Sequence, residues 1–385
     1  CAQVAAAARA REGGAALAAA VQLTTRQMRR VLLCVVLSSA SALTFAPRPT
    51  SVIIHVDPGQ NDRGPVQAAA EACGVALLPL HSAAAAADII EGEDSPGGLQ
   101  WPVVPQTGDE AAWAAQLPPG VRIRGVLCGS DGGLAEAERL ADVLTPERSN
   151  GLVAARRDKY LMNEALRAAG VDAARQSSPL DWGEVQPFLA QLGFPLVVKP
   201  RRGQAGVMVG IARSEAEARA MYESIVGERV SLELGGSTAV GSAVLQELLG
   251  GDEWVVDSVS RDGQHKVLAL WRYERGRANG APFVSFCDEL MPYAGAAAES
   301  LVRYASEVLD ALEWRWGACH MEVKLTSAGP RLVEINAGRW NCVAFKPLVD
   351  ACVGRNAYDV AVIALAGGSD AWVAIPATPP AKLRA

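Results

Sequence analysis

The chain has 385 residues, of which 50% are hydrophobic and 20% are charged. This length and composition allow a sizeable buried core in two or three domains and exclude a disordered protein. The formal net charge of −6 at pH 7 excludes a nucleic-acid binder that works through a broad basic surface. Any anionic ligand must therefore be held by local groups of basic residues.

The first 50 residues are predicted to precede the fold. From Met28, a basic start, the short apolar run Val31–Leu37 and the small residues Ala40–Ala42 form a signal-peptide pattern. Residues 40–47, ASALTFAP, resemble the junction of plastid-targeting presequences in algae. We expect a segment that directs the protein to a plastid or to the secretory pathway; a translated upstream extension of a cytoplasmic protein is the alternative. No segment approaches the roughly 20 apolar residues that a membrane-spanning helix needs.

Residues 51–150 have the pattern of an open α/β domain. The apolar strand Val52–Val56 leads through a predicted helix into a second strand, Val75–Leu80, and another strand-turn-helix pattern covers Arg124–Asp142. Such domains bind small ligands at the ends of their strands. Asp57 is therefore a candidate ligand contact, with an ordinary turn residue as the alternative.

A loop that could fold over phosphates follows a short buried strand. The strand Phe194–Pro200 contains Lys199, and the glycine-containing loop 201–207 leads into a predicted strand Val207–Ile211. Glycines let backbone N–H groups approach phosphates closely, and a lysine supplies a point charge. Lys159, in the first turn of the predicted helix Arg157–Ala169, is a second basic candidate. The spacing does not match a P-loop.

The stretch 246–253, QELLGGDE, is predicted to connect two lobes. A hinge of this kind exposes backbone groups that can bond an adenine edge, and Glu253 could accept ribose hydroxyls. The strands Trp254–Ser260 and Val267–Tyr273 flank an Asp-Gly turn and are predicted to form a hairpin.

Residues 320–336 read as a second hairpin that sets two carboxylates against each other. If the hairpin is centred on Ala328, Glu322 lies opposite Glu334, with Asn336 on the same face. Like charges in this position are destabilising unless a cation lies between them. Two carboxylates and an amide oxygen suit Mg²⁺. A solvated strand face with two ordinary glutamates is the alternative.

These motifs, in this order, resemble the ATP-grasp superfamily over about residues 51–368. Within it, the chain is most similar to the L-amino-acid ligases and carnosine-synthase-like enzymes. The similarity rests on the stretches ARRDKYLM at 155–162, VKP at 198–200, QELLGGDE at 246–253 with VVDSVS at 255–260, and EINA at 334–337.

The resemblance implies an α/β fold class, with an N-terminal open α/β (pre-ATP-grasp) domain followed by a two-lobed α+β ATP-grasp domain. The predicted divisions are a presequence or extension at 1–50, the N-terminal domain at 51–150, the ATP-grasp domain at 151–368 with a phosphate lid at about 185–250, and a tail at 369–385.

The resemblance also implies roles for individual residues. The predicted ATP contacts are Lys159, Lys199, the lid residues Gly203, Gln204, Ala205 and Gly206, the hinge residues Gln246, Glu247 and Leu249, and Glu253. Glu322, Glu334 and Asn336 become the Mg²⁺ ligands. Related enzymes carry arginine two residues after the asparagine, whereas this chain has Arg339 one position later, either as the catalytic arginine or as a solvated one. His320 stands where some ligases have a catalytic arginine.

The implied activity is that of an ATP-dependent ligase that joins a carboxylate to an amine through an acyl phosphate. The expected cofactors are ATP and Mg²⁺, or Mn²⁺ in its place. The expected partners are small-molecule carboxylate and amine substrates, with no nucleic acid; a homodimer is left open. Carboxylation, phosphoryl transfer and a non-catalytic nucleotide sensor are the alternatives. Substrate identity depends on the N-terminal domain and on loops such as Arg275–Phe286.

Overall fold

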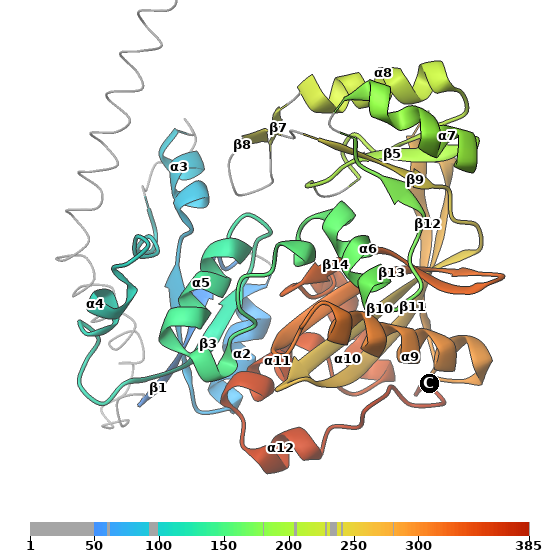
Figure 1. The fold of residues 1–385 in the computed structure, drawn as a ribbon. Helices are drawn as coiled ribbons and strands as arrows, with labels where there is room; N and C mark the ends of the chain where they lie inside the picture. Colours follow the sequence, from blue (N-terminus) through green and yellow to red (C-terminus); the bar gives the residue numbers. More distant parts are fainter. Residues whose placement is uncertain are drawn as a thin grey trace, which may run out of the picture.

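The structure is a computed structural model that describes residues 50–59, 62–91, 99–179, 181–203, 206–227, 229–231, 237–239, 242–279 and 281–384. The predicted targeting segment before residue 50 lies outside these ranges, as do the lid residues Gln204 and Ala205. Figure 1 shows an N-terminal domain beside a large lobe, with a smaller lobe above them. Within the described ranges, no helix combines the length and the apolar character that crossing a bilayer requires.

The N-terminal domain is built on three parallel strands in the order β2-β1-β3. The strands are β1 (Ser51–Val56), β2 (Ala76–Leu80) and β3 (Arg122–Cys128), and the helices are α2 (Arg63–Ala72), α3 (Ala83–Glu91), α4 (Glu110–Ala114) and α5 (Leu134–Leu144). Both faces of β1 are covered, which explains its continuous apolar run. Ile53 faces a cluster with α2, whereas Ile54 faces a cluster with α4 and α5.

The small upper lobe is an antiparallel sheet in the order β4-β9-β5-β6, backed by two helices. Its strands are β4 (Gln176–Ser177), β5 (Leu196–Pro200), β6 (Gly210–Ala212) and β9 (Ala243–Glu247), and its helices are α7 (Gln186–Leu192) and α8 (Glu215–Gly227). A short hairpin of β7 (Arg229–Ser231) and β8 (Ser237–Ala239) precedes β9. Every residue of β5 is buried, and Lys199 is therefore a buried cation.

The large lobe is a five-stranded antiparallel sheet in the order β12-β11-β10-β13-β14. Its strands are β10 (Asp252–Arg261), β11 (Gln264–Ala278), β12 (Ala281–Met291), β13 (Gly317–Thr326) and β14 (Gly329–Ala337). Helices α6 (Lys159–Ala168) and α9 (Gly295–Ala311) cover one face with apolar side chains. The opposite face carries the polar residues of the candidate site on β13 and β14, and α10 (Lys346–Cys352) covers its β11 side.

The C-terminal helices complete the core of the N-terminal domain. Helix α11 (Ala357–Ala366) packs in one cluster with β1, α2 and β3, and α12 (Ser369–Val373) follows it. Residues 369–384, predicted as a tail, bury Trp372 and Ile375 in the same cluster. The N-terminal domain therefore shares its core with the end of the chain.

Three predicted local boundaries are corrected by the structure. Helix α6 begins at Lys159 because Asp158 is its N-cap and accepts bonds from the next turn. Strand β6 begins at Gly210 because residues 206–208 form a turn. The segment Arg275–Phe286, expected as a loop, consists mainly of the paired ends of β11 and β12.

The hinge between the lobes depends on Gly251, and this gives a first prediction. Its φ is +89°, and an added Cβ would lie 2.1 Å from the carbonyl oxygen of Leu325, which is backbone and cannot move aside. Gly251→Ala should therefore lower the free energy of unfolding by about 2 kcal/mol or more in urea denaturation.

Gly250→Ala is the matched control, because an added Cβ there meets nothing within 4 Å. Its effect should stay within about 0.5 kcal/mol. Equal stabilities of the two variants would contradict a close approach at Gly251.

Candidate functional site

The hairpin of β13 and β14 places two glutamates directly opposite each other. Glu322 pairs with Glu334, and His320 pairs with Asn336. The predicted pairing of Glu322 with Glu334 is confirmed, but the hairpin is not centred on Ala328. The turn places Thr326 opposite Gly329, and a bulge at Val333 then shifts the register by one residue, so that Glu334 lies opposite Glu322.

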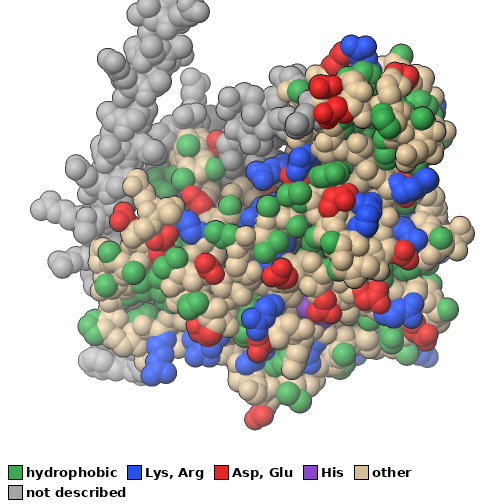
Figure 2. All heavy atoms as spheres, in the orientation of Figure 1, with side chains coloured by type: hydrophobic (Ala, Val, Ile, Leu, Met, Phe, Trp, Pro, Cys, Tyr) green, Lys and Arg blue, Asp and Glu red, His purple; other side chains and the backbone are tan. Residues whose placement is uncertain are grey.

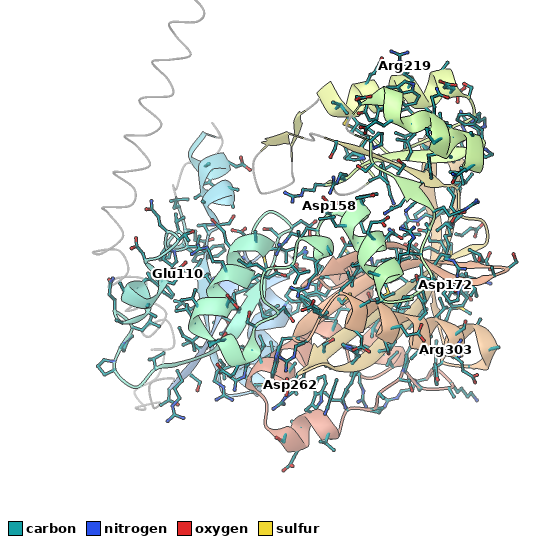
Figure 3. The ribbon with its side chains drawn as sticks, in the orientation of Figure 1. Glu110, Asp158, Asp172, Arg219, Asp262 and Arg303 are labelled. Carbon is teal, nitrogen blue, oxygen red and sulfur yellow. The ribbon has the colours of Figure 1, made fainter. Side chains whose placement is uncertain are left out.

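A lysine from another element compensates one of these carboxylates. Lys159 Nζ lies 2.7 Å from Glu334 Oε1 and donates a 2.7 Å bond to the carbonyl oxygen of Gly203. The same lysine therefore contacts the hairpin of the large lobe and the predicted phosphate loop. Its position is fixed by Asp158, the N-cap of α6, which lies between the two lobes in Figure 3.

The predicted loop arginine Arg201 supports that cap. Its guanidinium donates to both carboxylate oxygens of Asp158, and its Cζ lies 5.2 Å from the centroid of the Tyr160 ring. In the structure it joins the start of the loop to α6. Figure 2 shows Lys and Arg side chains, in blue, where the upper lobe meets the rest of the molecule.

Lys199 is the second buried cation of the site. Its Nζ donates to Gln246 Oε1 at 2.9 Å and to the carbonyl oxygen of Val333, the bulged residue, at 3.4 Å. Burial, followed by repulsion from Lys159, lowers the pKa of Lys199 to about 8, against the attraction of the two glutamates. A ligand phosphate would favour the protonated form of this amine.

His320 is held by a carboxylate that sequence reasoning did not assign. Its Nδ1 donates to Asp257 Oδ1 at 2.8 Å, and its Nε2 lies 3.8 Å from Glu322 Oε1. Burial alone would lower the pKa of His320, but the hydrogen bond to Asp257 and the charge of nearby Glu322 outweigh burial and raise the pKa to about 10. The pKa of Glu322 is lowered: burial opposes this shift, and the nearby charge of His320 outweighs burial.

The sequence held a signal for Asp257. It is a charged residue within an apolar strand, VVDSVS, and it is buried. A buried carboxylate needs several donors. It receives further bonds from Trp271 Nε1 and Asn341 Nδ2.

The hinge residues lie along the edge between the lobes. Gln246 is buried and accepts a hydrogen bond from Lys199, whereas Glu247 accepts one from Arg175 at the surface. Leu249 lies in the connection between β9 and β10, and its contact with adenine stays a prediction. Glu253, the predicted ribose contact, is buried between Arg275 at 3.0 Å and Lys324 at 3.2 Å.

Arg339 lies away from the paired glutamates, on the side of the N-terminal domain. Its Nε is 3.1 Å from Asp131 Oδ1, and its Nη1 donates to the carbonyl oxygen of Cys128. Cys128 ends β3, so Arg339 joins the large lobe to the carboxyl edge of the N-terminal sheet. To act in catalysis, as predicted, the Arg339 side chain would have to leave Asp131 and turn toward the paired glutamates.

The hairpin fits a hard divalent cation by its donor set. Glu322, Glu334 and Asn336 supply oxygen donors from neighbouring positions of two paired strands, and all three are half-buried. Lys159 and His320 neutralise the same carboxylates in this structure. Among the described residues, no group of three His, Cys, Asp or Glu side chains could hold a metal, so an amide or ligand oxygen must complete the set.

Residues 192–344 match the ATP-grasp domain family. The chain therefore contains an ATP-grasp domain in this region. It is 32% identical over 246 residues to dapdiamide A synthase of Enterobacter agglomerans, a match that covers 63% of this chain. The match spans about half, 56%, of that relative's length. N5-carboxyaminoimidazole ribonucleotide synthase of Mycobacterium tuberculosis is 35% identical over 116 residues, which is 28% of this chain and 26% of that protein.

Solved ATP-grasp structures share the fold across most of the chain. The L-amino acid ligase of Bacillus licheniformis superimposes with a TM-score of 0.61 at 18% identity, covering 86% of this chain and 77% of that one. N5-carboxyaminoimidazole synthetase of Staphylococcus aureus, complexed with ADP, gives a TM-score of 0.60 at 16% identity, covering 85% and 79%. These neighbours confirm the predicted α/β architecture with its two-lobed ATP-grasp domain.

The pKa of Lys199 predicts a pH effect on stability. The unfolded chain binds this proton at the ordinary pKa of 10.5, whereas the folded chain loses it near pH 8. Between these values the unfolded state holds more protons, so stability rises with pH. Relative to Lys199→Met, the free energy of unfolding of the unmodified protein should rise by about 3 kcal/mol from pH 7.5 to 10.5.

Lys382→Met, at an exposed lysine, is the control for that measurement. Its difference from the unmodified protein should stay constant over the same pH range. A constant difference for Lys199→Met as well would show that the Lys199 amine keeps its ordinary affinity for protons.

The Asp257–His320 pair makes a third prediction. A histidine with a raised pKa contributes stability that is complete below pH 6.5 and is lost as the pH rises through about 10. Asp257→Asn should lower the pKa of His320 by about 1 to 3, read from the imidazole protons by NMR titration. Asp310→Asn, which alters the His265–Asp310 pair, should leave His320 unchanged; equal shifts in both variants would refute the specific role of Asp257.

Proposed function

We propose that this protein is an ATP-dependent carboxylate–amine ligase that forms an amide between small amino-acid-like substrates and releases ADP and phosphate. The observation that carries the proposal is the meeting of Lys159, Glu334 and the Gly203 carbonyl between the lobes. It joins a cation, a carboxylate and a glycine loop at one point. Similarity to dapdiamide A synthase and to an L-amino acid ligase supports the choice of reaction.

The nucleotide would lie between the upper and large lobes. Lys159 and Lys199 both make bonds where the two lobes meet, so they would bind the phosphates, with the loop from Gly203 to Gly206 closing over them. Leu249 would offer backbone groups to the adenine. Glu253 can take a ribose hydroxyl only by sharing oxygens that already accept from Arg275 and Lys324.

A divalent metal would be held by Glu322, Glu334 and Asn336. When bound, it would neutralise negative charge on the transferred phosphoryl group. Lys159 and Glu334 neutralise each other in this structure, so ligand binding would separate them, the lysine turning to phosphate and the carboxylate to metal. His320, bonded to Asp257, fixes the position and the ionised state of Glu322.

The reaction then needs little covalent help from the protein. A substrate carboxylate oxygen attacks the γ-phosphorus and displaces ADP, which gives an acyl phosphate. An amine attacks the acyl carbon, the C–O bond to phosphate breaks, and the amide forms as the amine loses a proton. Closure of the upper lobe excludes water and protects the acyl phosphate. Arg339 is the candidate cation for that group once it leaves Asp131.

The test is phosphate release from Mg²⁺-ATP by the full chain, with amino acids supplied singly and in pairs. Release should require two substrates and should be accompanied by a product of the mass expected for the amide. Glu334→Gln should reduce the rate about 100-fold or more, because it removes a charge that acts on the phosphoryl transfer.

Glu307→Gln is the matched control, since Glu307 is exposed on α9, the helix that covers the opposite face of the sheet. It should retain the unmodified rate. Bicarbonate-dependent release would instead favour carboxylation, which the similarity to N5-carboxyaminoimidazole ribonucleotide synthase makes the second candidate. ATP binding without any substrate-dependent release would contradict the ligase proposal.

A further inference from the structure

An ion pair joins the start of helix α6 to the segment that follows strand β5. Asp158 is the N-cap of α6, and Arg201 is the first residue after β5. Arg201 Nε donates to both carboxylate oxygens of Asp158, at 3.0 and 2.9 Å, and its Nη2 lies 2.8 Å from Oδ2. The Asp158 side chain is 6% exposed and that of Arg201 is 23% exposed. A pair bonded at several points and partly shielded from water is stronger than an exposed ion pair. We call it the Asp158–Arg201 clasp.

The clasp lies beside Lys159, the first residue of α6. The backbone N–H of Lys159 donates to the carbonyl oxygen of Arg201 at 2.9 Å, and its Nζ donates to the carbonyl oxygen of Gly203 at 2.7 Å. Both the backbone and the side chain of Lys159 are therefore attached to the segment 201–203. A shift of that segment relative to α6 would displace the Lys159 amine.

Asp158 also holds the first turn of α6. Its Oδ1 accepts from the backbone N–H groups of Tyr160 and Leu161, each at 3.1 Å. Because an N-cap carboxylate orients the turn that carries Lys159, the pairing with Arg201 acts on that lysine as well. A buried carboxylate without a cation beside it would in addition repel the phosphates of a nearby nucleotide. Arg201 compensates this charge.

The bonds of Arg201 favour a role that acts through Lys159 over direct contact with phosphate. Its Nε and Nη2 are bonded to Asp158, and its Cζ lies 5.2 Å from the centroid of the Tyr160 ring. To bond phosphate through these nitrogens, Arg201 would have to leave Asp158. The buried carboxylate would then lose its cation, which is strongly unfavourable.

We propose that Arg201 and Asp158 are positioning residues for nucleotide binding: together they hold Lys159, and neither contacts the nucleotide. The inference rests on the proposed ligase function, in which Lys159 binds phosphate, and adds two residues to that site. Neither residue is among the ATP contacts that the sequence predicts.

A double-mutant cycle in the full chain tests this proposal. The dissociation constant of a non-hydrolysable ATP analogue with Mg²⁺ is measured by calorimetry for Arg201→Ala, Asp158→Asn and the double variant. Asparagine caps helices as well as aspartate does, so Asp158→Asn keeps the cap and removes the charge. Each single variant should weaken binding about 10-fold, and the double variant by about the same factor, because all three break one clasp. Arg201→Lys, which keeps the charge, should recover part of the loss.

Asp158→Asn separates the two roles of Arg201. If Arg201 bonds phosphate directly, Arg201→Ala weakens binding, whereas Asp158→Asn leaves it unchanged or tightens it by freeing the guanidinium. That result would overturn the proposal, as would losses that multiply in the double variant. Adenosine, which has no phosphate, should bind within about 2-fold of the unmodified affinity in every variant. An equal loss for adenosine would show damage to the fold and would also overturn the proposal.

Arg219→Ala is the matched control. Arg219 pairs with Glu223 at 2.8 Å on α8 of the same lobe, and both side chains are 58% exposed. Figure 3 shows Arg219 at the outer end of the upper lobe, away from Asp158. Its affinity for the ATP analogue should stay within about 2-fold of the unmodified value. A loss equal to that of Arg201→Ala would contradict a specific role of the clasp.

Amide formation from pairs of amino acids distinguishes this inference from the proposed function. Nucleotide binding that follows the expected cycle, without any amide, would refute the ligase proposal and keep the clasp. Amide formation with nucleotide binding that both single variants leave unchanged would keep the ligase and refute the clasp. No binding of the ATP analogue by the unmodified protein would refute both.

Discussion

The structure depends on two glutamates that face each other across one hairpin. Glu322 and Glu334 carry like charge at directly paired positions, an arrangement that destabilises a sheet unless cations lie beside it. Lys159 approaches from α6 and His320 from the same strand. Because Lys159 also bonds the Gly203 carbonyl, compensation of the carboxylates draws the phosphate loop toward the large lobe.

The bulge at Val333 links the paired glutamates to Lys199. It shifts β14 by one residue so that Glu334, rather than Val333, lies opposite Glu322. The carbonyl oxygen of Val333 accepts a bond from Lys199 on the buried strand β5 of the upper lobe. One extra residue thus sets the register of the carboxylates and provides a contact between lobes. A bulge at a functional edge is a common way to redirect a strand locally.

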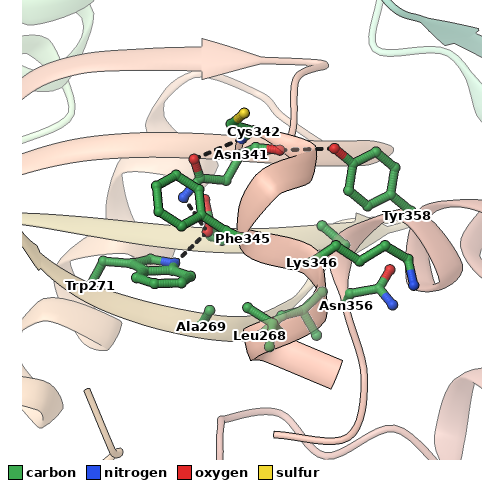
Figure 4. Close-up of a pocket in the computed structure, with 12 residues that line it drawn as sticks. Leu268, Ala269, Trp271, Asn341, Cys342, Phe345, Lys346, Asn356 and Tyr358 are labelled. Carbon is green, nitrogen blue, oxygen red and sulfur yellow. Dashed lines mark hydrogen bonds between the residues drawn. The ribbon is translucent and has the colours of Figure 1, made fainter. Parts of the chain in front are cut away.

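The polar site also extends across the large sheet through Asp257. This buried carboxylate accepts bonds from His320 on one side and from Trp271 and Asn341, both drawn in Figure 4, on the other. The orientation of His320 beside Glu322 therefore depends on a residue of the neighbouring strand β10. Arg339 adds a connection to the N-terminal domain through its ion pair with Asp131.

The bulge at Val333, which brings Glu334 opposite Glu322, was decided by the structure. The sequence by itself determined the strands and the hairpin, because alternation and turn residues act over a few positions of the chain. It also placed Lys159 and Lys199 at the start of a helix and in a buried strand. Tertiary structure decided what these residues contact: Lys159 meets Glu334, Asp257 receives His320, and Arg339 joins Asp131. It also decided that α11 and Trp372 complete the N-terminal core. Such contacts join residues far apart in sequence, and their geometry is fixed only when the lobes pack together, so no local pattern could specify them.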